Sequence, residues 1–189
     1  MKRISSKKIK QLRRYFKNKG LLNRNPRVLG LLISEKEKDY FLETIEKIEN
    51  QIDDVPIVPG IQTHASEEIF STAGITFKLL QIGGKYGLYT LALEYMYKKY
   101  GRFNKKPLSD YNYTILIREE KIPEMYRNLG LPQNVDRNEF VKSMVLIHEF
   151  VHVVEMETHQ RLFPESSKEC LQMELSIIKE LSKKFLRVG

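Results

Sequence analysis

The chain has little cysteine and no long uncharged apolar stretch. Its 189 residues include one cysteine, Cys170, which excludes an intramolecular disulfide and suits a reducing compartment. The first thirty residues lack the apolar core of a secretory signal. No apolar run approaches the ~20 residues that a membrane-spanning helix needs. We therefore expect a cytoplasmic protein with no membrane-spanning segment.

Acidic residues are missing from the beginning of the chain. Residues 1–28 contain eleven Lys and Arg and no Asp or Glu, whereas residues 29–189 contain 21 basic and 24 acidic residues. The net charge of +8 therefore comes from the N-terminal segment. We predict a basic arm or helix over 1–28 and one domain over 29–189. The arm could bind nucleic acid or another anionic surface. Alternatively, it is an amphipathic helix that packs Ile9, Leu12 and Phe16 on the domain.

Hydrophobic periodicity predicts an α+β fold, mainly helical with a small β-sheet. Long helices are expected over about 5–17, 34–52, 86–100, 136–159 and 163–186, and strands over 74–82 and 111–118. Short helices are expected over 64–72 and 123–129, and a loop over 53–60. The alternation of side chains in 111–118 predicts a half-buried strand. Gly83 and Gly84 allow a second reading, in which a hairpin leads into another strand in place of the helix at 86–100.

The string His148-Glu149-Phe150-Val151-His152 lies in an otherwise apolar run from 144 to 154. Side chains four residues apart on a helix point to one face, so the two imidazoles can hold one zinc ion. The glutamate after the first histidine can act as a base toward a metal-bound water. Because unpaired buried polar groups cost several kcal/mol, the apolar surroundings favour a metal site at His148 and His152, with Glu149 as the catalytic base.

A catalytic zinc site needs a third protein ligand. The last predicted helix contains the glutamates Glu165, Glu169, Glu174 and Glu180. At about 100° per residue, Glu174 lies at the centre of the apolar stripe of that helix, whereas Glu169 lies among its polar residues. If the two helices pack antiparallel across a turn near 160–163, residues 148–152 face about 170–176. We therefore predict Glu174 as the third ligand. The alternatives are Glu169 as ligand, or a Glu174 that pairs with a buried Arg or Lys.

Four further side chains have the chemistry of ligands: Glu155, His159, Cys170 and His64. Glu155 shares the helix face of the two histidines and could either orient one of them or form a salt bridge. His159 lies one place beyond the third histidine of an H-E-x-x-H-x-x-G-x-x-H site, so we do not expect it to bind metal. We expect Cys170 to be a small core residue and His64 to lie in a solvated loop.

With these residues, the chain resembles the zincin metallopeptidases, and among them the gluzincins, over about residues 111–186. The resemblance implies a minimal core of an edge strand, the H-E-x-x-H helix and a following helix that carries the third ligand. In zincins the edge strand lines the cleft and pairs with the substrate backbone, a role that would fall to Tyr111–Arg118 here.

The function that these observations predict is hydrolysis of peptide bonds in a protein or peptide substrate, with Zn²⁺ as cofactor and Glu149 as general base. The oxyanion could be stabilised by Tyr111, Tyr113, Tyr126 or Arg161. The alternative is a regulatory module that binds nucleic acid through its basic N-terminus and has a structural or vestigial metal site. Both could hold together, as in a peptidase held near DNA by its arm. A third reading is a scaffold that has lost its substrate.

Overall fold

The computed structural model describes residues 1–50, 73–79, 81–82, 85–86, 88–101, 106–121, 126, 129, 136–164, 166–181 and 185. The loop predicted at 53–60, the helix predicted at 64–72 and His64 lie outside the described residues. Of the helix predicted at 123–129, only Tyr126 and Leu129 are described.

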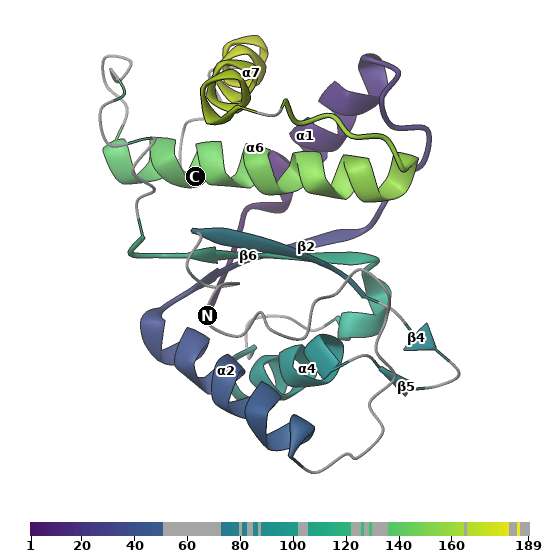
Figure 1. Ribbon diagram of the computed structural model, residues 1–189, viewed down its shortest axis with the longest axis vertical. Coiled ribbons are helices and arrows are strands. Elements are labelled where there is room, and N and C mark those ends of the chain that lie inside the picture. The colour runs from purple at the N-terminus through teal and green to yellow at the C-terminus, as the bar shows by residue number, and fades with distance from the viewer. Residues whose placement is uncertain are drawn as a thin grey trace.

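A four-stranded mixed sheet forms the middle layer of the fold (Figure 1), with the strand order β1-β2-β6-β3. Its strands are β1 (Lys2–Arg3), β2 (Val28–Ile33), β6 (Tyr113–Arg118) and β3 (Gly74–Lys78). β2 runs parallel to β6, with Val28 opposite Tyr113, and β3 runs antiparallel to β6, with Gly74 opposite Ile117. β6 is therefore a central strand, and β3 is an edge strand of the sheet.

The prediction that residues 111–118 form a half-buried edge strand is wrong. β6 lies between β2 and β3, and its first five residues are buried. The alternation in the sequence is misleading because Thr114 and Leu116, which were expected on the solvated side, are also buried. A strand covered by helices on both faces has no solvated side.

Helices cover both faces of the sheet (Figure 1). On one face lie α1 (Ser6–Asn18), α6 (Arg137–Thr158) and α7 (Ser167–Glu180), and on the other lie α2 (Glu35–Glu49) and α4 (Leu88–Tyr100). Each face has its own hydrophobic core, one beneath α1, α6 and α7 and one beneath α2 and α4. The predicted α+β class is confirmed. No helix in the described part of the chain combines the length and apolar content needed to cross a bilayer.

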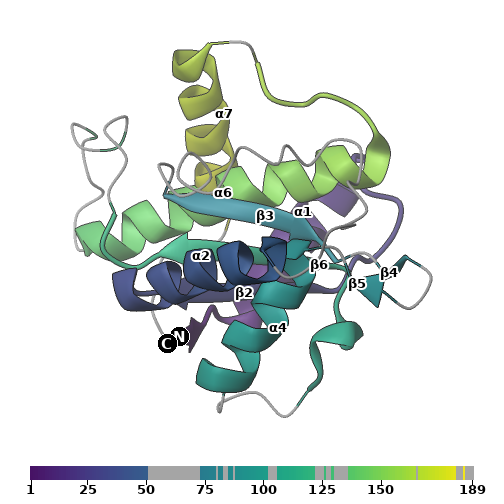
Figure 2. The ribbon, with the colours of Figure 1, turned by 60° about the horizontal axis from the view of Figure 1, so that its bottom comes forward.

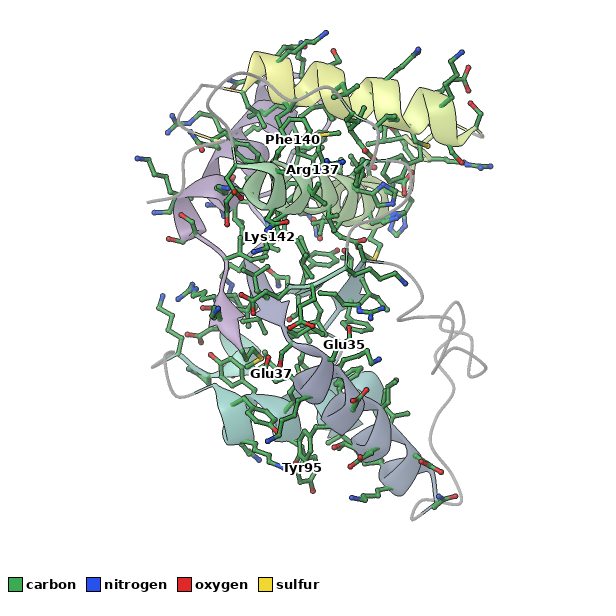
Figure 3. All side chains as sticks on the ribbon, turned by 90° about the vertical axis from the view of Figure 1, so that its left-hand side faces the viewer. Glu35, Glu37, Tyr95, Arg137, Phe140 and Lys142 are labelled. Carbon is green, nitrogen blue, oxygen red and sulfur yellow. The ribbon has the colours of Figure 1, made fainter. Side chains whose placement is uncertain are left out.

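The two layers of helices can be followed in a view from the side (Figure 3). The labelled residues of α6, Arg137, Phe140 and Lys142, lie on one side of the sheet, and Glu35 and Glu37 of α2 and Tyr95 of α4 lie on the other. The α6 helix is preceded by the N-cap residue Asp136, whose side chain accepts a hydrogen bond from the backbone N–H of Glu139 at 3.0 Å. A capping box of Ser34 and Glu37 opens α2.

Within the described residues, α7 is shorter than the helix predicted over 163–186, of which residues 165, 182–184 and 186 lie outside the described part of the chain. α7 begins after Ser166, whose hydroxyl accepts a hydrogen bond from the backbone N–H of Glu169 at 3.3 Å. It ends at Glu180, because Leu181 has an extended backbone with ψ of 142°. The serine cap therefore sets the start of the helix, rather than Pro164, which precedes it.

The two readings of the segment after β3 are each correct in part. Two short strands, β4 (Gln81–Ile82) and β5 (Lys85–Tyr86), pair antiparallel as in the hairpin reading. The predicted helix then follows as α4, two residues later than expected. A single 3-10 turn, η1 (Leu108–Asp110), precedes β6.

The N-terminal residues belong to the same layered fold. β1 pairs with β2, and α1 buries Ile9, Leu12 and Phe16, as an amphipathic helix packed on the domain should. The Phe16 ring stacks on Phe150 of α6 with their centroids 5.8 Å apart. The domain boundary at residue 28 stays a prediction.

Candidate metal centre

The H-E-x-x-H string lies in α6, the longest described helix, and twelve of that helix's 22 residues are buried. The rings of His148 and His152 are neighbours, with centroids 5.0 Å apart and planes at 80°. Their side chains are 31% and 41% exposed, whereas Glu149 is only 5% exposed. The helix thus presents two accessible imidazoles on one face and turns the glutamate toward the sheet.

Glu149 meets the edge strand β3, which runs beside α6 (Figure 2). The Thr76 hydroxyl lies 2.7 Å from Glu149 Oε2 and 3.0 Å from the Glu149 carbonyl oxygen, so it can donate to either. A Cβ built on Gly74 would lie 2.8 Å from both Cγ and Oε1 of Glu149. Glycine at this position therefore allows the strand to approach the carboxylate closely. Neither Gly74 nor Thr76 was predicted as part of the site.

Burial raises the pKa of Glu149, while the Thr76 hydrogen bond and the two neighbouring imidazoles oppose the rise; the net shift is upward. A carboxylate with a raised pKa is a better proton acceptor than one in water, provided that it is ionised. The environment of Glu149 is thus suited to a general base.

Glu174 is fully buried on α7 and lies against the motif helix. Its Oε1 is 2.6 Å from His148 Nδ1, and its Oε2 accepts a hydrogen bond from the Tyr126 hydroxyl at 2.6 Å. Each oxygen of the carboxylate has a partner, and neither partner is the buried Arg or Lys considered as an alternative. Glu169, the other candidate ligand, is exposed at the start of α7 and accepts a hydrogen bond from the Ser166 hydroxyl at 2.7 Å.

A second carboxylate lies against the other histidine. Glu155 Oε2 is 3.0 Å from His152 Nδ1, and Glu155 Oε1 accepts hydrogen bonds from the backbone N–H groups of Leu162 and Phe163 at 2.7 and 2.9 Å. Burial raises the pKa of Glu155, but these two backbone donors and His152 outweigh it, so the net shift is downward. This geometry is compatible with both readings of Glu155, as a residue that orients His152 and as its salt-bridge partner.

Each imidazole therefore has a carboxylate at Nδ1, which leaves Nε2 as the nitrogen for a metal ion. Metal-binding histidines commonly have such a carboxylate at the other ring nitrogen. Burial lowers the pKa of His148, but the hydrogen bond to Glu174 and the charge of Glu149 raise it by more. Among the described residues, neither Nε2 has a hydrogen-bond partner.

Two imidazoles and a carboxylate are a donor set that zinc prefers. In the described part of the chain, however, no three His, Cys, Asp or Glu side chains are already arranged around one metal position. Glu174 Oε1 instead lies 2.6 Å from His148 Nδ1, the ring nitrogen that is not expected to bind the metal. The residues thus fit zinc by their chemistry. To serve as the third ligand, Glu174 must exchange its hydrogen bond with His148 for the metal.

One aromatic side chain that was not predicted as part of the site, Phe163, covers both imidazoles. The Phe163 ring centroid lies 4.4 Å from that of His148 and 4.8 Å from that of His152. Phe163 comes from the connection between α6 and α7, so the same turn that carries the chain to Glu174 also shields the two histidines from one side.

Of the four residues predicted as candidates for stabilising the oxyanion, Tyr126 contacts a predicted metal ligand, and the other three have different surroundings. Tyr126 lies in the site, bonded to Glu174, and burial and the Glu174 charge raise its pKa. Tyr113 donates to Glu157 at 2.6 Å, and Tyr111 accepts from Arg3 at 3.1 Å. Arg161 is exposed in the α6–α7 connection.

Two other side chains with the chemistry of metal ligands, His159 and Cys170, form no hydrogen bond with His148 or His152 in the described part of the chain. His159 is exposed and ends α6 in a left-handed conformation, with φ of 56°. The Cys170 thiol is half-buried and lies 3.4 Å from the Pro164 carbonyl oxygen.

No protein-family model matches the chain, and no curated protein or solved structure matches it.

Proposed function

We propose that the protein is a zinc-dependent metallopeptidase of the cytoplasm, with Glu149 as its general base. The observation that carries the proposal is a cluster of four side chains: the two neighbouring imidazoles and Glu149 of α6, and the fully buried Glu174 of α7, whose Oε1 lies 2.6 Å from His148 Nδ1. The helical spacing of α6 alone brings His148, His152 and Glu149 together. It does not explain why a fully buried carboxylate from α7 lies against them, and burying such a group is costly unless it has a partner.

In this proposal His148 and His152 hold the metal through Nε2, and Glu174 is the third ligand. A bound zinc ion would lower the pKa of a water to about 7 and polarise the scissile carbonyl. Glu155 fixes the orientation of His152 through its contact with Nδ1. Tyr126 holds the second oxygen of Glu174, so it determines where that carboxylate can turn.

Glu149 accepts the proton of the attacking water and passes it to the leaving amine. Its carboxylate lies beside β3, so the edge strand at the site is β3 rather than the segment 111–118. A substrate that reached Glu149 would pass along this strand.

Zinc uptake and peptide cleavage by the purified chain test the proposal together. We expect one zinc ion per chain, hydrolysis of a mixed peptide library, and loss of hydrolysis on chelation with recovery on zinc addition. Glu174→Ala should weaken zinc binding by more than the 10- to 100-fold typical of a residue that only orients a ligand. Glu169→Ala, from the exposed side of α7, is the matched control and should bind zinc as the parent does. Equal zinc affinity in the two variants would exclude Glu174 as a ligand.

Thr76→Val removes the hydroxyl that faces Glu149 but keeps the shape of the side chain. We expect a loss of about 10-fold or more in kcat with little change in KM, since Thr76 positions the base rather than the substrate. Thr76→Ser restores a donor on the same Cβ and should recover most of the rate. The prediction fails if Thr76→Val and Thr76→Ser have the same kcat.

A further inference from the structure

The outer face of α1 carries a continuous row of basic side chains. Its members are the exposed residues Lys7, Lys10, Arg14 and Lys17, which we call the basic stripe. Their spacing of three, four and three residues places them on one side of the helix, opposite the buried Ile9, Leu12 and Phe16. At 1.5 Å per residue the stripe is about 15 Å long.

The basic stripe is not neutralised by the part of the protein that the structure describes. Residues 1–28 contain no acid, and no ion pair joins the stripe to any described residue. Two lysines beside the stripe do form ion pairs. Lys8 Nζ lies 3.7 Å from Glu139 Oε2, and Lys19 Nζ lies 2.7 Å from Glu180 Oε2. Glutamates near α1 therefore pair with lysines at the sides of the helix, whereas the positive charges of the basic stripe face the solvent.

We propose that the basic stripe is a docking surface for the phosphate backbone of a nucleic-acid duplex. Charge complementarity selects an anionic partner, and a straight row of positive charges about 15 Å long matches a regular polyanion. This inference is independent of the proposed peptidase activity, because it requires neither zinc nor Glu149.

The packing of α1 argues against a lipid surface as the partner. An amphipathic helix binds a bilayer by inserting its apolar face, but Ile9, Leu12 and Phe16 are only 7%, 0% and 3% exposed. That face is committed to the core, where Phe16 stacks on Phe150.

The aromatic residues of α1 also argue against a single strand. Proteins that bind single strands stack bases on exposed aromatic rings. Tyr15 is half-buried, lies edge-on to Phe16, and has its hydroxyl 3.4 Å from Glu180. The stripe therefore offers charge without a stacking platform, which suits contact with phosphates and no reading of sequence.

The test compares two triple variants of equal charge. The stripe variant is Lys7→Gln/Lys10→Gln/Lys17→Gln, and the control is Lys36→Gln/Lys47→Gln/Lys98→Gln, with exposed lysines from α2 and α4 on the other face of the sheet. Each full-length protein is titrated by fluorescence anisotropy against a mixed-sequence DNA duplex of about 20 base pairs, between about 50 and 200 mM salt. Thermal melts show that both variants are folded.

We expect the parent and the control to bind with a slope of log K against log salt of about −3 to −4, since each phosphate contact contributes about −0.9. The stripe variant should lose about 2 to 3 of that slope and most of its affinity at low salt. The proposal is overturned if the parent does not bind the duplex, if the two variants bind equally, or if phosphatidylserine vesicles bind the parent more tightly than the duplex does. A single strand that binds as tightly as the duplex would also overturn it.

Discussion

Glu149→Gln is expected to abolish peptide hydrolysis while the protein still binds zinc. General-base catalysis contributes about 10²- to 10⁴-fold to a rate, so kcat/KM should fall by about that factor. Glutamine has the same shape, and its amide oxygen can still accept the hydrogen bond from Thr76, so the contact between β3 and α6 should survive. Zinc content measured on the same sample shows whether the metal site is intact. A variant that cleaves peptides as fast as the parent would refute the mechanism.

The same variant has an expected effect on stability. The pKa of Glu149 is raised in the folded state. At pH values just above the ordinary pKa of a glutamate, the folded protein therefore binds more protons than the unfolded chain. The unfolding free energy of the metal-free protein should fall as the pH rises through this range. Glu149→Gln removes this contribution, so near neutral pH it should unfold at an equal or higher denaturant concentration than the parent. Glu169→Gln, an exposed glutamate, provides the comparison.

Gly74→Ala should impair both stability and activity. The added Cβ would lie 2.8 Å from Glu149 Cγ and Oε1 and 2.8 Å from Val145 Cγ1, so β3 or α6 must shift. Overpacking of this kind typically costs about 1–3 kcal/mol of unfolding free energy. A displacement of the catalytic base by about 1 Å can cost about 10²-fold in rate. Denaturant unfolding and peptide hydrolysis measure the two effects separately.

A second substitution distinguishes the two contacts of Gly74. Gly74→Ala/Val145→Ala removes the side chain that meets the new methyl group on one side but leaves the contact with Glu149. If the approach of β3 to Glu149 limits activity, the rate of the double variant should stay low whether or not its stability changes. Full recovery of the rate would show that Val145, and not the carboxylate, requires glycine here.

The position of Glu174 could be predicted because it depends on local rules. A period of 3.6 residues places it at the centre of the apolar stripe of α7, and the short connection to α6 sets which residues of the two helices face each other. The structure brings it to His148, as expected from these two rules, and leaves Glu169 at the exposed start of the helix.

The edge strand and its contacts could not be predicted because they depend on pairing between distant segments. Nothing in residues 113–118 shows that β2 and β3 lie on either side of them. Thr76 and Gly74 become part of the site only because β3 pairs antiparallel with β6 and thereby runs beside α6. The alternation in 74–78 places Gly74 and Thr76 on one face, but only the fold shows that this face meets Glu149. Tyr126 is similar, since its contact spans 48 residues of chain.

The contacts of Phe163 have a mechanical consequence. Glu155 binds the backbone N–H groups of Leu162 and Phe163 with one oxygen and His152 with the other, and the Phe163 ring rests on both imidazoles. A movement of the Leu162–Phe163 backbone away from the histidines would break the hydrogen bonds that Glu155 accepts there, and the same carboxylate contacts His152. We therefore expect a displacement of this backbone, as distinct from a rotation of the Phe163 ring alone, to be coupled to a reorientation of His152.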